Sequence, residues 1–160
     1  MKKNIELATQ LADNLLEKGW MMSCAESCTG GGVAYVATEI AGSSQWFERG
    51  FVTYTNEAKH QMLAVDVETI ERYGAVSQSV VREMAAGALT FSNAQISVAI
   101  SGIAGPGGAT EGKPVGTVCF GWQTVEGEQR QETCQFIGNR QEVREQAIEH
   151  AYKGLILMTS

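Results

Sequence analysis

The stretch AESCTGGG, residues 25–32, joins two apolar segments that differ in their spacing. Residues 20–24 form a short apolar run, which predicts a buried strand. Between Val33 and Ile40, apolar residues recur at helical spacing. A helix that starts after such a glycine-rich turn has backbone N–H groups without intrahelical partners, and its dipole favours negative charge there. The stretch therefore predicts a site for an anionic group, or for negative charge that develops during a reaction.

The overall composition argues against several classes of protein. Of the 160 residues, 44% are hydrophobic and 19% are charged, as in soluble globular proteins. The net charge of −6 argues against nucleic-acid binding, which depends on basic residues that neutralise phosphates. No apolar run is long enough to span a membrane, and residues 1–6 lack the apolar segment of a signal peptide. We expect one domain over residues 1–160, a cytoplasmic location, and neither nucleic acid nor a membrane as partner.

The cysteines and histidines predict no structural metal site. The four cysteines form no C-x-x-C pair, and only two histidines are present. Structural zinc sites usually show closely spaced ligand pairs, and disulfide frameworks belong to short secreted chains, so we expect reduced, mostly buried thiols. The residues concerned are Cys24, Cys28, Cys119, Cys134, His60 and His150.

Strands and helices alternate along most of the chain, and a hairpin lies near its end. Apolar spacing and glycine stops predict helices over residues 4–18, 33–41, 57–63, 67–73, 78–88 and 140–158. The capping residues expected for the last four of these are Asn56, Asp66, Ser77 and Asn139. Apolar and β-branched runs predict strands over residues 20–24, 51–55, 96–101, 115–124 and 129–137. This order of elements predicts an α/β fold, a three-layer α/β/α sandwich with a mixed β-sheet.

Three of the predicted strands are followed by segments suited to chemistry. These segments are residues 26–32, residues 54–59 and residues 101–105, where a long glycine-rich loop begins. Ligands in such sheets usually bind beyond the carboxyl ends of the strands. The three segments therefore predict a site at that edge of the sheet.

A serine and a lysine in these segments suggest nucleophilic catalysis. The Ser27 hydroxyl needs a base, and neither histidine lies in a recognisable catalytic motif. Lys59 follows the second strand closely, and burial would lower its pKa and let it act as the base. Tyr54 could pass a proton between them or orient the lysine. Backbone N–H groups from Cys28 to Gly31 could hold the oxyanion of a tetrahedral intermediate.

Each of these residues also has a simpler interpretation. Ser27 or Thr29 could cap the second helix, and Lys59 could be a solvated helix residue. Cys28 is a rival nucleophile, because a helix N-terminus lowers a thiol pKa. Arg140 and Arg144 share a helix face, where they could bind a phosphate or be solvated, and the residue pattern alone favours solvation.

A series of ordered motifs covers nearly the whole chain and resembles the CinA C-terminal domain family. The motifs occupy residues 25–31, 41–44, 47–50, 52–59, 74–77, 101–106 and 113–118. Stand-alone members of this family are nicotinamide-nucleotide amidases. The resemblance implies hydrolysis of nicotinamide mononucleotide to nicotinic acid mononucleotide and ammonia, in pyridine nucleotide salvage, by a Ser/Lys mechanism without metal or cofactor.

The resemblance also assigns roles to residues of this chain. Ser27 is implied as the nucleophile, Lys59 as the base and Tyr54 as the assisting hydroxyl. Substrate contacts are expected from a larger set of residues at the three strand ends and on the last helix. These are Cys28, Thr29, Gly30, Gly31, Ser101, Gly102, Gly105, Arg140 and Arg144.

Two other functions remain open on the sequence alone. The chain could be a nucleotide-binding member of the same family that has lost turnover, or a cysteine amidase that uses Cys28. The oligomeric state is also open, because the hydrophobic residues Trp46, Phe47 and Phe51 fit either the core or a homodimer interface. Of the oligomeric states we favour the homodimer.

Overall fold

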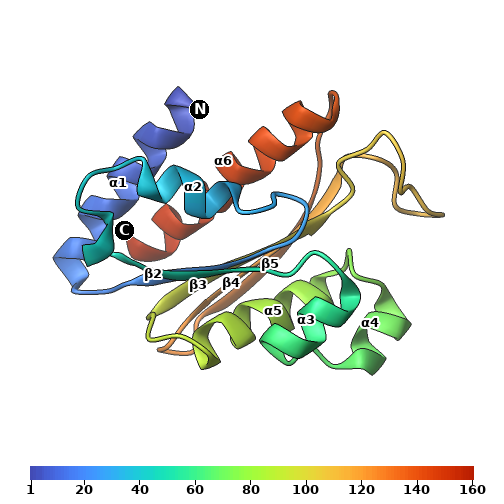
Figure 1. Cartoon of the computed structure of the whole chain (residues 1–160), viewed down its shortest axis with the longest axis horizontal. Helices are drawn as coiled ribbons and strands as arrows, with labels where there is room; N and C mark the ends of the chain where they lie inside the picture. The colour runs from blue at the N-terminus through green and yellow to red at the C-terminus, as the bar shows by residue number, and fades with distance from the viewer.

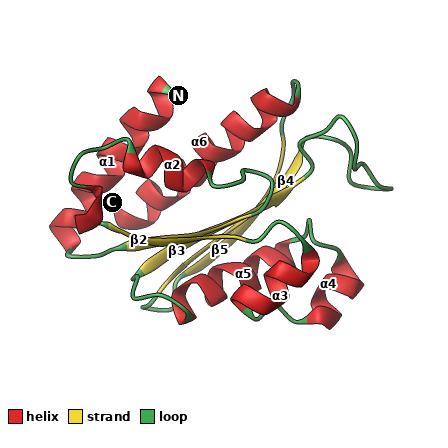
Figure 2. Ribbon diagram, viewed as in Figure 1, coloured by secondary structure: helices red, strands yellow, loops and turns green.

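The computed structural model describes residues 1–160 as one sheet between two layers of helices (Figures 1 and 2). Helices α1, α2 and α6 cover one face of the sheet, and α3, α4 and α5 cover the other. The predicted three-layer α/β/α sandwich is therefore confirmed. The elements are α1 (Lys2–Lys18), β1 (Met22–Glu26), α2 (Gly32–Thr38), the 3₁₀ turn η1 (Ser43–Gln45), β2 (Phe47–Val52), α3 (Asn56–Leu63), α4 (Val67–Tyr73), α5 (Gln78–Thr90), β3 (Ile96–Gly102), β4 (Thr117–Thr124), β5 (Gln129–Gln135) and α6 (Arg140–Thr159).

The sheet is mixed, as predicted, and its strand order is β2-β1-β3-β4-β5. Strand β1 runs parallel to both β2 and β3, whereas β4 is antiparallel to β3 and to β5. The carboxyl ends of β1, β2 and β3 therefore lie together at one edge of the sheet. This topology brings the turns after the three strands side by side, although they lie far apart in the sequence.

Each face of the sheet has its own hydrophobic core. The larger cluster has 23 buried residues and lies under α1, α2 and α6, while the smaller has 11 and lies under α3, α4 and α5. Successive residues of β1 alternate between them, so Cys24 belongs to the first core and Ala25 to the second. Trp46 is 1% exposed within the larger core. Its side chain stabilises the fold of one chain and is not part of an exposed surface.

Several predicted element boundaries were wrong. Strand β1 is two residues later than predicted, because Ala25 and Glu26 still pair with Phe51 and Val52 of β2. Strand β2 begins four residues earlier than predicted, at Phe47. It is an edge strand with exposed residues in its middle, so its sequence lacks the continuous apolar pattern of a buried strand.

Side-chain caps start four of the helices. Asp66 and Ser77 cap α4 and α5 as the sequence predicts, and Asn139 forms a capping box with α6. The cap of α3 is Thr55 rather than Asn56, since its hydroxyl accepts a hydrogen bond from the Ala58 amide at 3.0 Å. This cap fixes the turn between β2 and α3, on which Lys59 lies.

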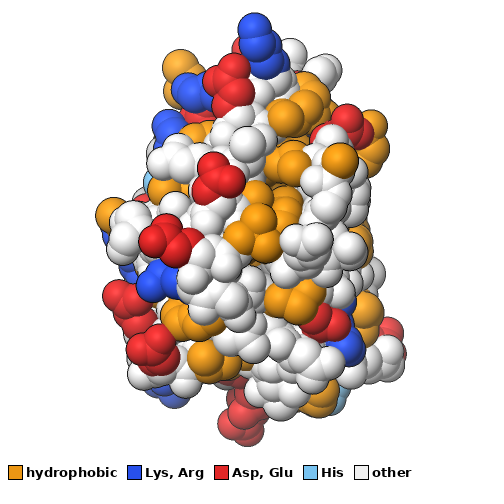
Figure 3. Space-filling view, turned by 90° about the vertical axis from the view of Figure 1, so that its left-hand side faces the viewer, with side chains coloured by type: hydrophobic (Ala, Val, Ile, Leu, Met, Phe, Trp, Pro, Cys, Tyr) orange, Lys and Arg blue, Asp and Glu red, His pale blue; other side chains and the backbone are white.

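None of the helices combines the length and apolar character needed to cross a membrane. The face at the amino ends of the parallel strands carries acidic, basic and hydrophobic side chains interspersed with one another (Figure 3). No continuous basic surface is visible on that face.

Candidate active site at the carboxyl edge of the sheet

Ser27 and Lys59 meet at the carboxyl edge of the sheet. Ser27 follows β1 directly, and the first turns of α3 bring the Lys59 ammonium nitrogen to 3.0 Å from the Ser27 hydroxyl oxygen. Lys59 is 1% exposed and Ser27 is 7% exposed. The predicted pair is therefore brought together in a site from which nearly all water is excluded.

The surroundings of Lys59 favour its neutral form. Its nitrogen donates to the carbonyl oxygens of Thr53 at 3.0 Å and Tyr54 at 3.1 Å, and no carboxylate forms an ion pair with it. Burial lowers the pKa of Lys59 from 10.5 to about 8, because desolvation disfavours the charged form. A neutral amine that keeps both carbonyl contacts has its lone pair left for the proton of Ser27.

The first turn of α2 is already occupied by a carboxylate from the protein itself. Glu26 is 1% exposed, and its side chain accepts hydrogen bonds from the amides of Val33 at 2.9 Å and Ala34 at 3.1 Å. It also accepts from the Thr29 hydroxyl at 2.6 Å. The negative charge expected at this helix start is therefore supplied by Glu26 of the chain itself. Glu26 also ties the turn that carries Ser27 to the helix.

Three amides in the same turn, those of Cys28, Thr29 and Gly31, donate to no other residue. The Ser27 carbonyl accepts from the Gly30 amide at 3.0 Å, and the Cys28 carbonyl accepts from Arg144 at 3.0 Å. The Ser27 carbonyl shares a peptide bond with the Cys28 amide, and the Cys28 carbonyl shares one with the Thr29 amide. Because the N–H and C=O of a trans peptide point in opposite directions, the amides of Cys28 and Thr29 point away from the hydrogen-bond partners of these two carbonyls. Neither amide donates to another residue in the structure. These two N–H groups are available to hold an oxyanion.

Gly30 and Gly31 make the tight turn possible. Both have positive φ angles, of +59° and +98°, which side chains with a Cβ rarely adopt. The consecutive left-handed residues turn the chain from the end of β1 into α2 within a few residues. Their function is thus to shape the turn, and their role as substrate contacts stays a prediction.

Tyr54 contacts the pair through its backbone and not through its hydroxyl. Its carbonyl oxygen accepts from Lys59 and, at 3.3 Å, from the Ser27 hydroxyl. Its side chain is 58% exposed, and its hydroxyl accepts from Arg140 at 3.2 Å. The expected proton relay has no contact to support it, because the Tyr54 hydroxyl has no hydrogen bond with Ser27 or Lys59.

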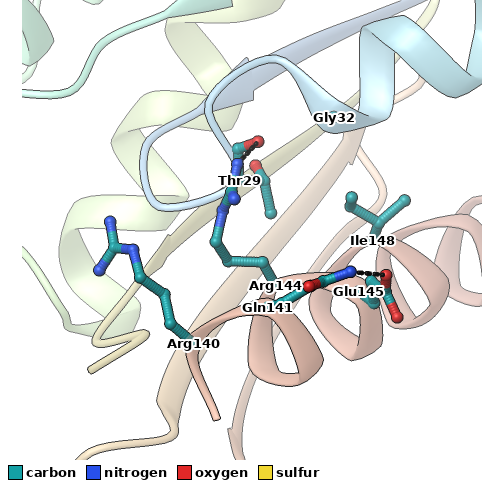
Figure 4. Close-up of a pocket in the computed structure, with 7 residues that line it drawn as sticks. All are labelled: Thr29, Gly32, Arg140, Gln141, Arg144, Glu145 and Ile148. Atoms are coloured by element: carbon teal, nitrogen blue, oxygen red, sulfur yellow. Dashed lines mark hydrogen bonds between the residues drawn. The ribbon is translucent and has the colours of Figure 1, made fainter. Parts of the chain in front are cut away.

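Two arginines extend from α6 toward the catalytic turn. Arg144 donates to the carbonyls of Cys28 and Thr29, and Arg140 donates to the Gly105 carbonyl at 2.8 Å. Figure 4 shows both side chains rising from the first turns of α6 beside a pocket of about 450 Å³. Neither guanidinium is paired with a carboxylate. They are therefore not simply solvated, and they leave positive charge at the mouth of the site.

The loop after β3 forms a second pocket next to the first. Its volume is about 250 Å³, and Arg140 lines both pockets. The lining residues are Cys28, Tyr54, Gly102, Ile103, Ala104, Gly105, Gly107, Gly108 and Arg140. The two pockets thus meet at Arg140, and the smaller one reaches Cys28, which follows Ser27 in the chain.

Ser101 lies beside Ser27 on the neighbouring strand. It follows Ile100, which pairs with Glu26 in the sheet, and it is 1% exposed. Its hydroxyl makes no hydrogen bond in the structure, which leaves it free to contact a bound molecule. The structure thus gathers all the predicted site residues around one edge, from four separate segments.

Cys28 is poorly suited to be the nucleophile. Burial raises the pKa of its thiol to about 11, which keeps it protonated at neutral pH. No histidine or lysine nitrogen forms a hydrogen bond with its sulfur. The negative charge of Glu26, which lies at the start of α2, also raises the pKa of this thiol.

The CinA C-terminal domain matches residues 4–159, which is nearly the whole chain. The chain belongs to this family. A CinA-family relative from Escherichia coli, the nicotinamide-nucleotide amidohydrolase PncC, is 53% identical over 151 residues, which cover 94% of this chain and 92% of the relative. The protein of the same name from Enterobacter agglomerans is 52% identical over 146 residues, covering 91% and 89%.

Solved CinA-family structures share the fold described above. The competence/damage inducible protein CihA from Agrobacterium tumefaciens superposes with a TM-score of 0.97 at 43% identity, covering 99% of this chain and 96% of that one. A CinA superfamily protein from Klebsiella pneumoniae gives a TM-score of 0.93 at 38% identity, covering 98% and 97%. The resemblance expected from the sequence is thereby confirmed.

Two residues of this CinA-family site were not singled out from the sequence. Glu26 lay within the quoted stretch but had no assigned role, and Thr53 was assigned only to a strand. Thr53 is fully buried, its carbonyl accepts from Lys59, and its hydroxyl has no hydrogen-bond partner. A buried glutamate directly before a glycine-rich helix start is a signal that could have indicated the cap.

Proposed function

We propose that residues 1–160 act as one amidohydrolase domain that converts nicotinamide mononucleotide to nicotinic acid mononucleotide and ammonia. The observation that carries this proposal is the contact between Lys59 and Ser27 at 3.0 Å, with no acidic partner to hold the lysine protonated. Relatives that are about half identical over most of their length have the name nicotinamide-nucleotide amidohydrolase. Their name supports the substrate, and the contact supports the mechanism.

The first half of the reaction forms an acyl-enzyme. Neutral Lys59 takes the proton of the Ser27 hydroxyl while the serine oxygen attacks the carboxamide carbon. The amides of Cys28 and Thr29 are the proposed donors to the resulting oxyanion. Loss of one such donor raises the activation barrier by roughly 3–4 kcal/mol. The Lys59 ammonium then gives its proton to the departing nitrogen, which leaves as ammonia.

The second half of the reaction reverses these proton transfers. Lys59, neutral again, takes a proton from water as the water oxygen attacks the ester carbon. The tetrahedral intermediate breaks its bond to Ser27, and the proton on Lys59 returns to the serine oxygen. Each step uses the same lysine once as base and once as acid, so the dyad needs no second titratable group.

The two pockets suggest how the nucleotide is oriented. We place the carboxamide-bearing ring in the smaller pocket, between Tyr54 and the loop of Gly102 and Gly105, next to Ser27. The phosphate then lies near the positive mouth formed by Arg140 and Arg144. Guanidinium groups favour phosphate because their N–H groups match its oxygens in a planar fork.

The test is ammonia release from nicotinamide mononucleotide by purified protein, with and without a chelator. We expect release by wild type in both conditions and none by Ser27→Ala. Ammonia release by Ser27→Ala would overturn the serine mechanism. Loss of release in Cys28→Ser, with release retained in Ser27→Ala, would favour Cys28 as the nucleophile. A folded wild type that binds the nucleotide without releasing ammonia would instead be a nucleotide-binding member of the family.

A further inference from the structure

Three potential metal ligands of different types meet on the side of the sheet away from Lys59. Glu132 and Cys134 are two residues apart on β5, so their side chains share one face of the strand. His150 of α6 lies over the same face. It is ten residues beyond Arg140, which corresponds to about 15 Å along the helix. The cluster is therefore separate from the proposed active site.

The donor atoms of the cluster converge on one point. The Nε2 atom of His150 lies 2.7 Å from a carboxylate oxygen of Glu132 and 3.5 Å from the sulfur of Cys134. All three donor atoms lie within 4.8 Å of one another. Both contacts use the same ring nitrogen, which is unlike a catalytic triad, where the histidine uses its two nitrogens for different partners.

Neighbouring side chains hold two of the three donors in place. The His150 ring packs against Phe120, Trp122 and Phe136, with centroid separations of 4.6, 5.8 and 6.2 Å. The second carboxylate oxygen of Glu132 is ion-paired with Arg130. Supporting contacts of this kind orient metal ligands and reduce the cost of bringing them together.

We propose that Glu132, Cys134 and His150 form a site for a zinc-like divalent transition-metal ion. Thiolate, imidazole and carboxylate donors suit Zn²⁺ and do not suit Mg²⁺ or Ca²⁺, which select oxygen ligands. Three protein donors leave a fourth position for water, and the side chains of His150 and Glu132 are 30% and 26% exposed, so water has access. Tetrahedral ligands of zinc lie roughly 3.3–3.7 Å apart, so the imidazole and carboxylate need to separate by less than about 1 Å.

Metal binding would join two elements at the edge of the sheet. Strand β5 is paired only with β4, and the ion would connect it directly to α6. On binding, the Cys134 thiol loses its proton to solvent and forms a metal–sulfur bond. An ion bound by the folded chain in preference to the unfolded one raises the free energy of unfolding.

Titration of the untagged protein with Co²⁺ tests the proposal. We expect one Co²⁺ per chain and a near-ultraviolet sulfur-to-cobalt charge-transfer band, which disappears on addition of Zn²⁺. Cys134→Ser should abolish the band. The matched control is Cys119→Ser, on the neighbouring strand and in the opposite core, which should keep it. Absence of the band in wild type, or its persistence in Cys134→Ser, would overturn the proposal.

Circular dichroism checks whether Cys134→Ser still folds. If it does not, a second variant and a second readout still test the site. Glu132→Gln keeps the shape of the side chain and should weaken Co²⁺ binding by at least about tenfold. Zn²⁺ should raise the thermal midpoint of wild type but not that of Glu132→Gln, and equal shifts in the two proteins would contradict the site. Ammonia release should be unaffected by Cys134→Ser, so this inference and the proposed function fail or succeed separately.

Discussion

The Lys59 side-chain nitrogen lies 3.0 Å from the Ser27 oxygen, and both are held by the Tyr54 carbonyl. That carbonyl accepts from the lysine at 3.1 Å and from the serine at 3.3 Å, so one backbone group fixes the relative position of nucleophile and base. A carbonyl oxygen carries no full negative charge and cannot neutralise an ammonium group as a carboxylate would. The arrangement therefore orients Lys59 while burial still lowers its pKa, and several consequences can be measured.

The first prediction concerns the pH dependence of turnover. Burial lowers the pKa of Lys59 to about 8, and only the neutral amine can accept the serine proton. We expect kcat/KM to rise about tenfold per pH unit well below this pKa and to level off above it. Initial rates of ammonia release across neutral and alkaline pH provide the measurement. A profile governed by a group near the ordinary pKa of histidine would contradict the assignment.

The second prediction compares neighbouring residues of the catalytic turn. Ser27→Ala removes the attacking oxygen and should lower kcat by roughly a thousandfold or more. Cys28→Ser changes a protonated thiol to a hydroxyl of similar size, and it keeps the backbone amide that we assign to the oxyanion. It should retain most of the activity. The comparison requires both variants to show wild-type circular dichroism.

The third prediction concerns Glu26 as a positioning residue. Glu26→Gln places an amide NH₂ where the carboxylate now accepts from backbone amides, leaving a buried donor without an acceptor at a cost of about 1–3 kcal/mol. We expect lower thermal stability and a lower kcat, with the alkaline pH profile set by Lys59 preserved. Glu39→Gln, at the exposed end of the same helix, is the control. A shifted pH profile would mean that Glu26 acts on the base and not on the turn.

The fold was predictable because its signals are local and repeated. The apolar runs of β1, β3 and β4 and the caps Asp66, Ser77 and Asn139 each determine one element independently. Strand β2 was misplaced because an edge strand buries little of its surface. Its pairing with β1 comes from tertiary contacts that no short window of sequence contains.

The proximity of the candidate site residues was predictable, but the contacts of their side chains were not. Ser27 and Lys59 each follow a strand, and the parallel pairing of those two strands brings their side chains together. The direction of the Tyr54 side chain depends on Arg140, which is 86 residues away. The helix cap by Glu26 depends on a turn geometry that two consecutive glycines allow, and composition alone does not specify it.

The fourth prediction separates phosphate binding from catalysis. Arg140→Met removes a cation from the mouth of the site, and charge-assisted hydrogen bonds of this type contribute about 1.5–3 kcal/mol. We expect KM for nicotinamide mononucleotide to rise by roughly ten- to a hundredfold, with a smaller change in kcat. Hydrolysis of nicotinamide riboside, which has no phosphate, should change little. Arg72→Met on α4 is the control, and equal losses for nucleotide and riboside would contradict the assignment.

The last prediction is that Lys59 makes the stability of the fold depend on alkaline pH. Its pKa is 10.5 when unfolded and about 8 when folded, so between these values the unfolded chain binds more protons. The free energy of unfolding therefore rises with pH across that interval, by on the order of 3 kcal/mol from this group alone. Below pH 8 Lys59 is protonated in both the folded and the unfolded chain, so the cost of burying its charge is fully present.

Lys59→Met isolates this contribution, because its unbranched side chain is only one atom shorter than that of lysine and has no titratable group. Urea unfolding of wild type and variant at several pH values gives the difference between their free energies of unfolding. The contributions of the other titrating groups cancel in this difference. We expect wild type to gain stability relative to Lys59→Met as the pH rises from about 8 toward 10.5. A constant difference across this range would mean that Lys59 is protonated in the folded state. The amine would then be unable to accept the proton of Ser27 at neutral pH.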